Sequence, residues 1–365
     1  MSLKQSNPFK KRYNIIFFTK GDICMASSRT RAYQFLPYLQ KEGLSIKIIV
    51  AEPYLDAIID MADSKIKKNL LRALRKSFKV FKWWNLLKLL LFSFFSESII
   101  IQKVILPKWF MFLLSKSNQI LLFDFDDAIF LNLDPHSLDL FNNTLKICKG
   151  VILENDYNAK YVHKFNTNIL KITGPIECNY YFPSLSKNNG NVVLGWIGSP
   201  STEKYLNSIM PVIRTLLNEY ENLRCLFVGL KSSNVYEHKR IHIYPWNLGN
   251  ELELLSEMDI GIMPLYNTDW ERGKGGYKAL VYMSMKIPPV VTPVEILKEI
   301  VIDSLNGFHA VNEQQWYDRL KTLIDSPEKR SIMGGNARDT VIKKYSYESS
   351  VPPLIGFINK FKDNQ

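Results

Sequence analysis

The sequence predicts an α/β protein in which parallel strands alternate with helices in two domains. Short apolar runs, such as residues 14–19 and 46–51, recur along the chain between segments of helical character. At residues 259–294, two apolar runs enclose a glycine loop and a helix, which together have the length that a parallel crossover requires. The chain of 365 residues also exceeds what one hydrophobic core usually supports, so two domains are expected.

Composition narrows the class of protein without selecting a function. With 46% hydrophobic and 22% charged residues, the chain is neither disordered nor fibrous. A formal charge of +12 favours acidic partners, which include nucleic acid, anionic lipid and phosphate-bearing substrates. The polar, basic N-terminus lacks the apolar core of a signal peptide, which predicts a cytoplasmic location.

The four cysteines predict neither a zinc site nor a disulfide framework. They are widely spaced and form no CxxC pair, at positions Cys24, Cys148, Cys178 and Cys225. We expect all four to be reduced thiols in the core.

The first strand, residues 14–19, is followed at 21–31 by a turn into a helix. Gly21 marks the turn, and Arg29 and Arg31 lie in the first helical turn, where anions are preferred to cations. Two interpretations stand equally here: the arginines hold a phosphate, or they pair with other surface groups.

Residues 64–96 interrupt the alternation. Eight basic residues and no acidic residue lie between positions 65 and 82, and the sequence WWNLLKLLLFSFF follows at 83–95. Asn85 and Lys88 break this apolar run, which is shorter than the roughly 18 residues that a spanning helix needs. We expect a helix lying on an anionic membrane surface. The alternative is a core helix of the N-terminal domain.

Three aspartates end a predicted strand at residues 119–127. Strands are also expected at 99–104 and 151–155, with helices at 107–116 and 137–146 between them. The carboxylates of Asp124, Asp126 and Asp127 therefore stand where open α/β sheets place ligands. Capping of the following turn accounts for one of them, and a functional role is expected for another.

A second set of alternating elements follows a linker at residues 173–190. Strands are predicted at 192–198, 224–230, 241–246, 259–265 and 289–294, with helices at 249–258, 314–324 and 328–344. After the first of these strands, Ser199 and Pro200 have the character of an N-cap and a first helical residue, which predicts exposed N–H groups for an anion.

The glycine loop at residues 266–276 is the strongest candidate ligand site. Gly273, Gly275 and Gly276 allow the backbone to approach a ligand and open a helix whose positive dipole end favours an anion. Lys274 and Lys278 are four residues apart, so both ammonium groups can serve one site. The alternative is a solvated basic helix end.

Six segments together resemble family 4 glycosyltransferases over nearly the whole chain: GWIGSPSTEKYL, DIGIMPL, WERGKGGYKALVYM with PPVVTPV, NGFHAV, SSRTR and DFDDAIF. The resemblance implies the GT-B fold, with two Rossmann-like domains that face a cleft. On this basis we expect an acceptor domain at 1–185, a nucleotide-sugar domain at 186–345, and a C-terminal helix at 346–365 that returns to the N-terminal domain.

The resemblance also implies where the donor lies. The diphosphate is expected over residues 198–204 and 274–278, and the nucleobase beside residues 244–247. The expected donor-binding residues are Gly198, Ser199, Ser201, Thr202, Lys204, Tyr244, Trp246, Asn247, Glu271, Gly273, Gly275 and Gly276. The expected catalytic residues are Asp126, Asp127, Lys274 and Lys278, and those expected for the acceptor or a phosphate are Gly21, Arg29 and Arg31.

The chain departs from the family pattern at two glutamates that bracket the sugar and ribose. Gly273 and Val281 stand at those positions, and Glu271 is the nearest substitute for the first. Ser199 stands where an arginine is common, whereas Lys204 matches the phosphate-binding lysine. No histidine follows the DFDD strand, so Asp126 or Asp127 is expected in its place.

The expected activity is that of a retaining hexosyltransferase. It would move a sugar from a nucleotide-sugar donor, with UDP-sugars favoured, to a lipid-linked saccharide in cell-surface polysaccharide biosynthesis. Neither a cofactor nor a metal is expected, nor is a nucleic-acid partner, and the protein is expected on the inner face of the cytoplasmic membrane. The alternatives are a catalytically inactive GT-B protein that binds nucleotide-sugars, a sugar-nucleotide epimerase, and a phosphorylase.

Overall fold

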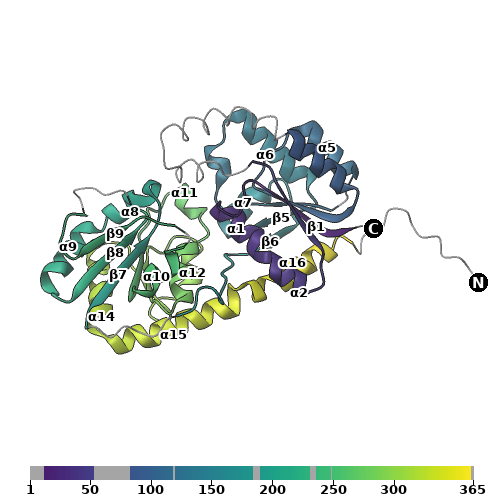
Figure 1. Ribbon diagram of the computed structural model, residues 1–365. Coiled ribbons are helices and arrows are strands. Elements are labelled where there is room, and N and C mark those ends of the chain that lie inside the picture. Colours follow the sequence, from purple (N-terminus) through teal and green to yellow (C-terminus); the bar gives the residue numbers. More distant parts are fainter. Residues whose placement is uncertain are drawn as a thin grey trace, which may run out of the picture. The chain divides into compact units, whose positions relative to one another are not determined.

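The computed structural model describes residues 12–52, 83–117, 120–183, 190–230, 236–247 and 249–362. The chain forms two compact units, each built on its own sheet with helices on both faces (Figure 1). Unit 1 comprises Met1–Glu154, Asn158–Ile172 and Ser350–Gln365, and unit 2 comprises Asn155–Tyr157 and Thr173–Ser349. The predicted α/β class is confirmed. The basic run at 65–82 lies outside the described residues.

Unit 1 contains a six-stranded sheet. Its strands are β1 (Tyr13–Thr19), β2 (Ile46–Val50), β3 (Ser96–Gln102), β4 (Leu121–Asp124), β5 (Gly150–Leu153) and β6 (Ile169–Lys171). The connecting helices are α1 (Ala26–Arg31), η1 (Tyr33–Phe35), α2 (Leu36–Lys41), α5 (Lys108–Ser117), η2 (Ile129–Asn132), α6 (Pro135–Ile147) and α7 (Asp156–Val162), together with helical residues 83–93.

All strand pairs in this sheet are parallel, in the order β2-β1-β3-β4-β5-β6. The direction in which successive strands are added reverses between β1 and β3, which is the switch point where doubly wound sheets bind ligands. The carboxyl ends of β1, β3, β4 and β5 therefore meet at one edge.

Unit 2 contains a second six-stranded sheet. Its strands are β7 (Val192–Ile197), β8 (Leu223–Val228), β9 (Ile241–Tyr244), β10 (Ile260–Met263), β11 (Pro289–Val291) and β12 (Phe308–His309). Its helices are η3 (Pro200–Thr202), α8 (Glu203–Asn207), α9 (Met210–Glu219), α10 (Glu251–Ser256), α11 (Asp269–Arg272), α12 (Tyr277–Ser284), α13 (Leu297–Ile300), α14 (Glu313–Asp325) and α15 (Pro327–Lys344).

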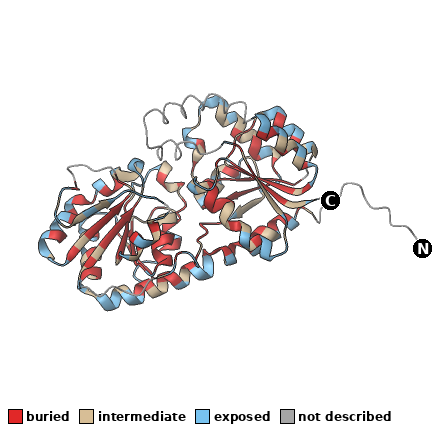
Figure 2. Ribbon diagram, viewed as in Figure 1, coloured by how far each residue is buried: buried red, intermediate tan, exposed pale blue. Residues whose placement is uncertain are grey.

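The order of this sheet, β12-β11-β10-β7-β8-β9, is the Rossmann order, and every pair is parallel. The switch point lies between β7 and β10. The central strands of both sheets are near-continuous apolar runs, which are buried because helices cover both faces (Figure 2), whereas the edge strands β2, β6 and β9 are only partly buried.

The boundaries between the two units differ from those predicted at residues 185 and 345. Unit 2 already begins at Thr173, because Ile176 pairs with Ser346 and the hydroxyl of Tyr181 donates to Glu251 at 3.0 Å. Helix α16 (Tyr347–Asn359) passes into unit 1 at Ser350.

The return of the C-terminal helix to the N-terminal unit is confirmed by its packing. A Cβ at Gly150 would lie 2.4 Å from the ring of Phe357, so the helix packs directly on β5. Lys362 forms an ion pair with Glu97 at 2.5 Å.

One expectation about the cysteines is wrong. Three of them are buried thiols, but Cys24 is exposed because it lies in the turn after β1 and not in a strand or helix. Among the residues that the structure describes, no helix combines the length and the apolar character needed to cross a membrane.

Candidate functional site

The serine turn, glycine turn and lysines expected at the donor site lie in the connections that follow β7 and β10, on either side of the switch point, and the residues expected at the nucleobase follow β9. The loop after β7 contributes Ser199, which is the N-cap of η3, with Pro200 as its first residue, as predicted. The N–H of Ser199 donates to the hydroxyl of Thr202 at 3.1 Å, and the hydroxyls of Ser199 and Ser201 lie 2.9 Å apart. A short, exposed turn rich in hydroxyl groups results.

Two glycines bring this loop close to the end of β8. Gly198 is expected from the sequence, and the structure adds Gly229, whose φ is +86°. A Cβ at Gly229 would lie 2.0 Å from the carbonyl oxygen of Gly198, and a Cβ at Gly198 would lie 2.2 Å from the ring of Trp196. Both positions therefore require glycine. Gly229 lies at the carboxyl end of the strand predicted at 224–230. A glycine at that end of a parallel strand was the sequence signal that could have identified it as a site residue.

Lys278 lies at the start of α12, half-buried, with its ammonium over the face of Trp196. Its Nζ lies 4.7 Å from the centre of that ring and 3.3 Å from the hydroxyl of Thr202. Removal from water, with a smaller contribution from Lys274, lowers the pKa of Lys278 from its usual 10.5 to about 7. A nearby anion would favour the ammonium form and raise this pKa again.

Lys274 comes from the turn that precedes α12. Gly276 is the N-cap of α12 with φ +73°, and a Cβ there would lie 2.6 Å from Ile300. The amide of Asn155 donates to the carbonyls of Gly273 and Lys274 at 2.9 and 3.2 Å. The buried Gly273 and Gly275 flank Lys274, whose Nζ lies 5.4 Å from the centre of the Trp270 ring. The backbone of this turn is thus held on both sides of Lys274.

Helix α12 is itself fixed by Tyr282, a residue that sequence reasoning missed. Its hydroxyl accepts from the N–H of Ile197 at 2.9 Å and donates to the carbonyl of Ile262 at 3.4 Å. A Cβ at Gly261 would lie 2.4 Å from the ring, so this glycine makes room for it. The tyrosine joins α12 to the ends of β7 and β10, and thereby sets the position of Lys278.

The carboxylate of Glu271 is buried and is hydrogen-bonded to two hydroxyl groups. It accepts hydrogen bonds from Tyr205 and Thr268. Burial alone would raise the pKa of Glu271, but these hydrogen bonds lower it below its usual value, so the carboxylate is ionised. Val281 is 2% exposed and belongs to the core. Substitution of Glu271 for a family glutamate stays a prediction.

Lys204 and the residues expected at the nucleobase are more exposed. The Nζ of Lys204 lies 5.0 Å from the ring centre of Tyr205. The indole of Trp246 donates to Glu251 at 3.1 Å, and Asn247 exchanges hydrogen bonds with Asn250. The side chain of Tyr244 at the end of β9 is exposed. Aromatic surface is therefore available beside the end of β9.

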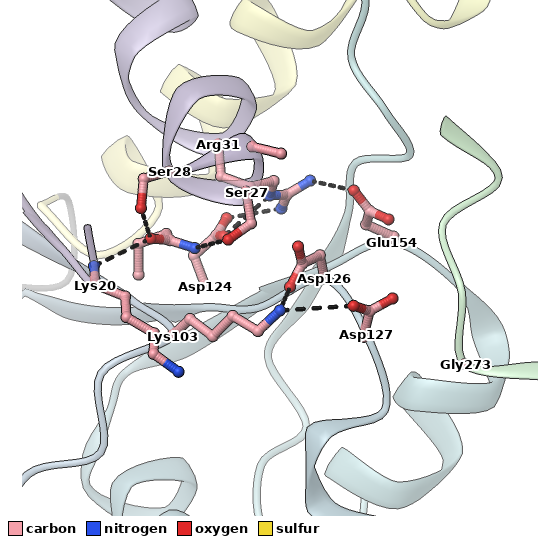
Figure 3. Close-up of polar contacts among 12 residues, drawn as sticks. Lys20, Ser27, Ser28, Arg31, Lys103, Asp124, Asp126, Asp127, Glu154 and Gly273 are labelled. Atoms are coloured by element: carbon pink, nitrogen blue, oxygen red, sulfur yellow. Dashed lines mark hydrogen bonds and ion pairs between the residues drawn. The ribbon is translucent and has the colours of Figure 1, made fainter. Parts of the chain in front are cut away.

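Unit 1 carries a second polar cluster, at the carboxyl edge of its own sheet. Arg31 is 1% exposed, with Nη2 and Nε donating to Asp124 at 2.7 and 2.9 Å (Figure 3). Its Nη1 donates to Glu154 at 3.4 Å and to the carbonyl of Ile172 at 2.7 Å. These contacts make Arg31 the centre of a buried ion network that joins α1, β4 and β5.

Gly21 and Arg29 also take part in local structure. The N–H of Gly21 donates to the hydroxyl of Ser28 at 3.1 Å, and Arg29 is buried and donates to the carbonyls of Ile23 and Cys24. The phosphate role of Arg29 and Arg31 stays a prediction.

Asp126 and Asp127 share one cation, Lys103, which reaches between them (Figure 3). Lys103 forms an ion pair with Asp126 and lies 3.6 Å from Asp127. Burial alone would raise the pKa of Asp126, but Lys103 lowers it below its usual value, so this carboxylate is ionised at neutral pH. The side chain of Asp127 is more exposed, at 33%.

Glu154 is the fourth carboxyl group of this edge. Burial raises its pKa to about 8, and the charge of Arg31 opposes that rise. Sequence reasoning missed both Glu154 and Lys103. Each lies at or just beyond the carboxyl end of a predicted strand, and that placement was the available signal. In the part of the chain that the structure describes, no group of three or more His, Cys, Asp or Glu could hold a metal ion.

Comparisons with known proteins agree with this architecture. Residues 180–340 match the family model described as Glycosyl transferases group 1. No curated protein matches the chain. Three solved structures share the fold at low identity. A glycosyltransferase from Rickettsia africae ESF-5 has a TM-score of 0.66 at 14% identity and covers 97% of this chain and 100% of its own.

A sucrose-phosphate synthase from Thermosynechococcus elongatus has a TM-score of 0.68 at 12% identity and covers 97% of this chain and 100% of its own. Anabaena HepE, solved in complex with UDP and glucose, has a TM-score of 0.66 at 12% identity and covers 96% of this chain and 100% of its own. Residues 180–340 therefore match a glycosyl transferases group 1 domain, and the chain as a whole has the GT-B fold.

Proposed function

We propose that this protein is a retaining family 4 hexosyltransferase that uses a UDP-sugar and acts on a lipid-linked saccharide in cell-surface polysaccharide biosynthesis. The observation that carries the proposal is the pair of lysines at the start of α12. Lys274 and Lys278 lie together at a glycine turn, and each lowers the cost of bringing a diphosphate there. The lowered pKa of Lys278 is typical of an ammonium group that is placed to bind an anion, because burial without a counter-charge disfavours its charged form.

The chemistry needs positive charge at the leaving group. Displacement of a nucleoside diphosphate from an anomeric carbon develops negative charge on the phosphates, and fixed cations stabilise it. Lys274 and Lys278 supply that charge, which a metal ion supplies in other transferases. We therefore propose a reaction without metal or cofactor.

The choice of uridine rests on a structural relative and on the nucleobase surface. Anabaena HepE was solved in complex with UDP-glucose, and the same fold spans this chain. The exposed ring of Tyr244 and the indole of Trp246, which Glu251 holds, offer an aromatic surface beside β9.

The acceptor is assigned to unit 1. In a retaining transfer without a protein nucleophile, the departing phosphate accepts the proton of the acceptor hydroxyl. Asp126 and Asp127, held by Lys103, orient that acceptor. The basic and aromatic segment at 64–96 would keep the enzyme on the inner face of the cytoplasmic membrane, where lipid-linked saccharides reside.

Donor binding and transfer test the proposal. In a thermal-shift panel of nucleotide-sugars, UDP-sugars should raise the melting temperature most, since ligand at about 100 times its dissociation constant adds roughly 2.7 kcal/mol of stability. Lys274→Ala should lower transfer about 100-fold with donor saturating, by loss of charge at the leaving group. Lys298, an exposed lysine of α13, provides the matched control as Lys298→Ala. Equal turnover in both variants would refute the role of Lys274.

A second candidate is a protein that binds nucleotide-sugars without catalysis. It is favoured by Gly273 and by the buried Val281, which offer no side-chain acceptor where the family has glutamates. Saturable binding of UDP-sugar without transfer or donor hydrolysis would decide for this candidate.

A further inference from the structure

Two helices of unit 1 run side by side on the same face of its sheet. Helical residues 83–93 precede β3, and α5 follows it. The rings of Trp83 and Trp109 stack near the starts of the two helices, with centroids 6.3 Å apart and an interplanar angle of 12°. Near their ends, the hydroxyl of Ser93 donates to that of Ser117 at 2.6 Å. The helices are therefore parallel neighbours.

The outer side of this pair is apolar, although both helices bury a separate apolar side. Leu86 and Leu89 of the first helix and Leu114 of α5 are in the core. Exposed fractions of 45% to 58% are found for the opposite residues, which we call the aromatic face: Trp83, Trp84, Leu87, Leu91, Trp109 and Phe112. A surface helix normally presents polar residues there, so the face is suited to a partner.

The charged residues on the two helices are all basic. Lys88 places its Nζ 5.7 Å from the ring centre of Trp84, and Lys116 places its Nζ 5.3 Å from that of Phe112. Lys108, at the start of α5, is exposed and forms an ion pair with Asp139 of α6 at 2.6 Å, so Lys88 and Lys116 are the lysines assigned to lipid phosphates. Neither helix contains an acidic residue. Aromatic rings flanked by lysines match the interface of an anionic bilayer, where rings enter the headgroup region and ammonium groups meet lipid phosphates.

We propose that the aromatic face docks unit 1 on an anionic lipid bilayer, with Trp109 and Phe112 of α5 inserting beside Trp83 and Trp84. The sequence indicated only the first helix. The contribution of α5 comes from the tertiary structure, because β3 separates the two helices in the chain. This proposal rests on the proposed function only for the reason to bind a membrane, which is to bring the enzyme to a lipid-linked acceptor.

The placement of the face within unit 1 fits that purpose. A helix that follows a parallel strand begins at the carboxyl edge of the sheet, and α5 begins five residues after Lys103. The stacked Trp83 and Trp109 are thus at the edge that carries Lys103, Asp126 and Asp127. A bilayer on the aromatic face would approach this edge of unit 1.

Vesicle flotation of the full-length protein tests the proposal. The wild type should float with vesicles of phosphatidylcholine and phosphatidylglycerol and should bind phosphatidylcholine alone more weakly. Trp109→Ser and Phe112→Ser should each weaken partitioning about tenfold, since each removes one apolar side chain from the interface. Lys116→Gln should weaken binding to the anionic vesicles about fivefold and leave binding to neutral vesicles unchanged.

The matched control is Ile332→Ser in α15 of unit 2, because Ile332 is 59% exposed and lies outside the aromatic face. It should float like the wild type. Thermal melting of each variant checks the fold, and Phe112→Ser, which leaves the Trp83–Trp109 stack intact, provides the second variant if Trp109→Ser is unstable.

Three results would overturn the proposal. The wild type could remain unbound at low salt. Flotation could persist when Trp109→Ser and Phe112→Ser are combined in one protein, which would assign binding to the first helix or to the basic run at 65–82 alone. The wild type could be a dimer that the α5 variants dissociate, which would make a second copy the occupant. UDP-sugar binding is measured in parallel without vesicles, so failure of the proposed function and failure of the docking surface are seen separately.

Discussion

Donor binding should take up a proton at Lys278. In the free protein the pKa of this lysine is about 7, so above neutral pH its amine is mostly uncharged. A bound diphosphate favours the ammonium form and raises that pKa. If the lysine must be charged in the complex, the dissociation constant should rise about tenfold per pH unit above 7, which is roughly 50-fold between pH 7 and pH 9.

Isothermal titration with a UDP-sugar measures this directly, since the diphosphate of a UDP-sugar does not titrate in that range. In buffers of different ionisation enthalpy at pH 8, about 0.9 proton should be taken up per donor bound. Lys278→Arg is the matched control, because a guanidinium stays charged throughout and should bind with little dependence on pH. A wild-type affinity that is constant from pH 7 to pH 9, with no proton uptake, would refute the reasoning.

The lowered pKa of Lys278 also makes the stability of the folded protein depend on pH. The folded pKa of Lys278 lies below its unfolded value of 10.5, so the unfolded chain binds more protons between about pH 7 and pH 10.5. This group therefore favours the folded state increasingly as pH rises through that window. Lys278→Met should raise the melting temperature of the free protein at pH 7 and remove the stabilisation by donor.

Three further predictions concern the acceptor carboxylates and the ion network of unit 1 and the glycine after β8 in unit 2. Asp126→Asn and Asp127→Asn, compared by steady-state transfer, should lower turnover for the residue that orients the acceptor, while UDP-sugar affinity stays unchanged; normal turnover in both would make the carboxylates structural. Arg31→Met should destabilise the protein by about 3–5 kcal/mol in urea unfolding, because it leaves Asp124 buried without its cation; a loss below 1 kcal/mol would contradict the network. Gly229→Ala should weaken UDP-sugar binding and lower the melting temperature, since φ is +86° and the new methyl group would meet a carbonyl oxygen; wild-type affinity would show that the loop adapts.

Much of the candidate site was visible in the sequence because its residues follow strands. Ser199 lies just beyond an apolar run, and Lys274 and Lys278 lie in the glycine turn and helix that connect two such runs; parallel strands bring these connections to one edge. The sequence did not decide whether Arg29 and Arg31 bind a phosphate or pair with other groups, because it does not show which distant residues lie beside them in the fold. The structure supplies those partners for Arg31, which meets Asp124 across 93 residues and Glu154 across 123.

The exposed aromatic residues of unit 1 were likewise only partly predictable from the sequence. The run at 83–95 stands out in the sequence by its composition, whereas α5 has the ordinary character of a helix between two strands. Only packing distinguishes the side of α5 that contacts the core from the side that carries Trp109 and Phe112.

The sequence by itself determined the alternation of strands and helices, the presence of two α/β units and the glycine turn with its two lysines. Hydrophobic period, glycine placement and helix-start residues are local properties, and they specify local structure. Tertiary structure alone decided the electrostatic state of the site. The pKa of Lys278 is lowered to about 7 by burial and by Lys274, and that burial depends on elements distant in the chain, such as Trp196 and Thr202, which lie against its ammonium group.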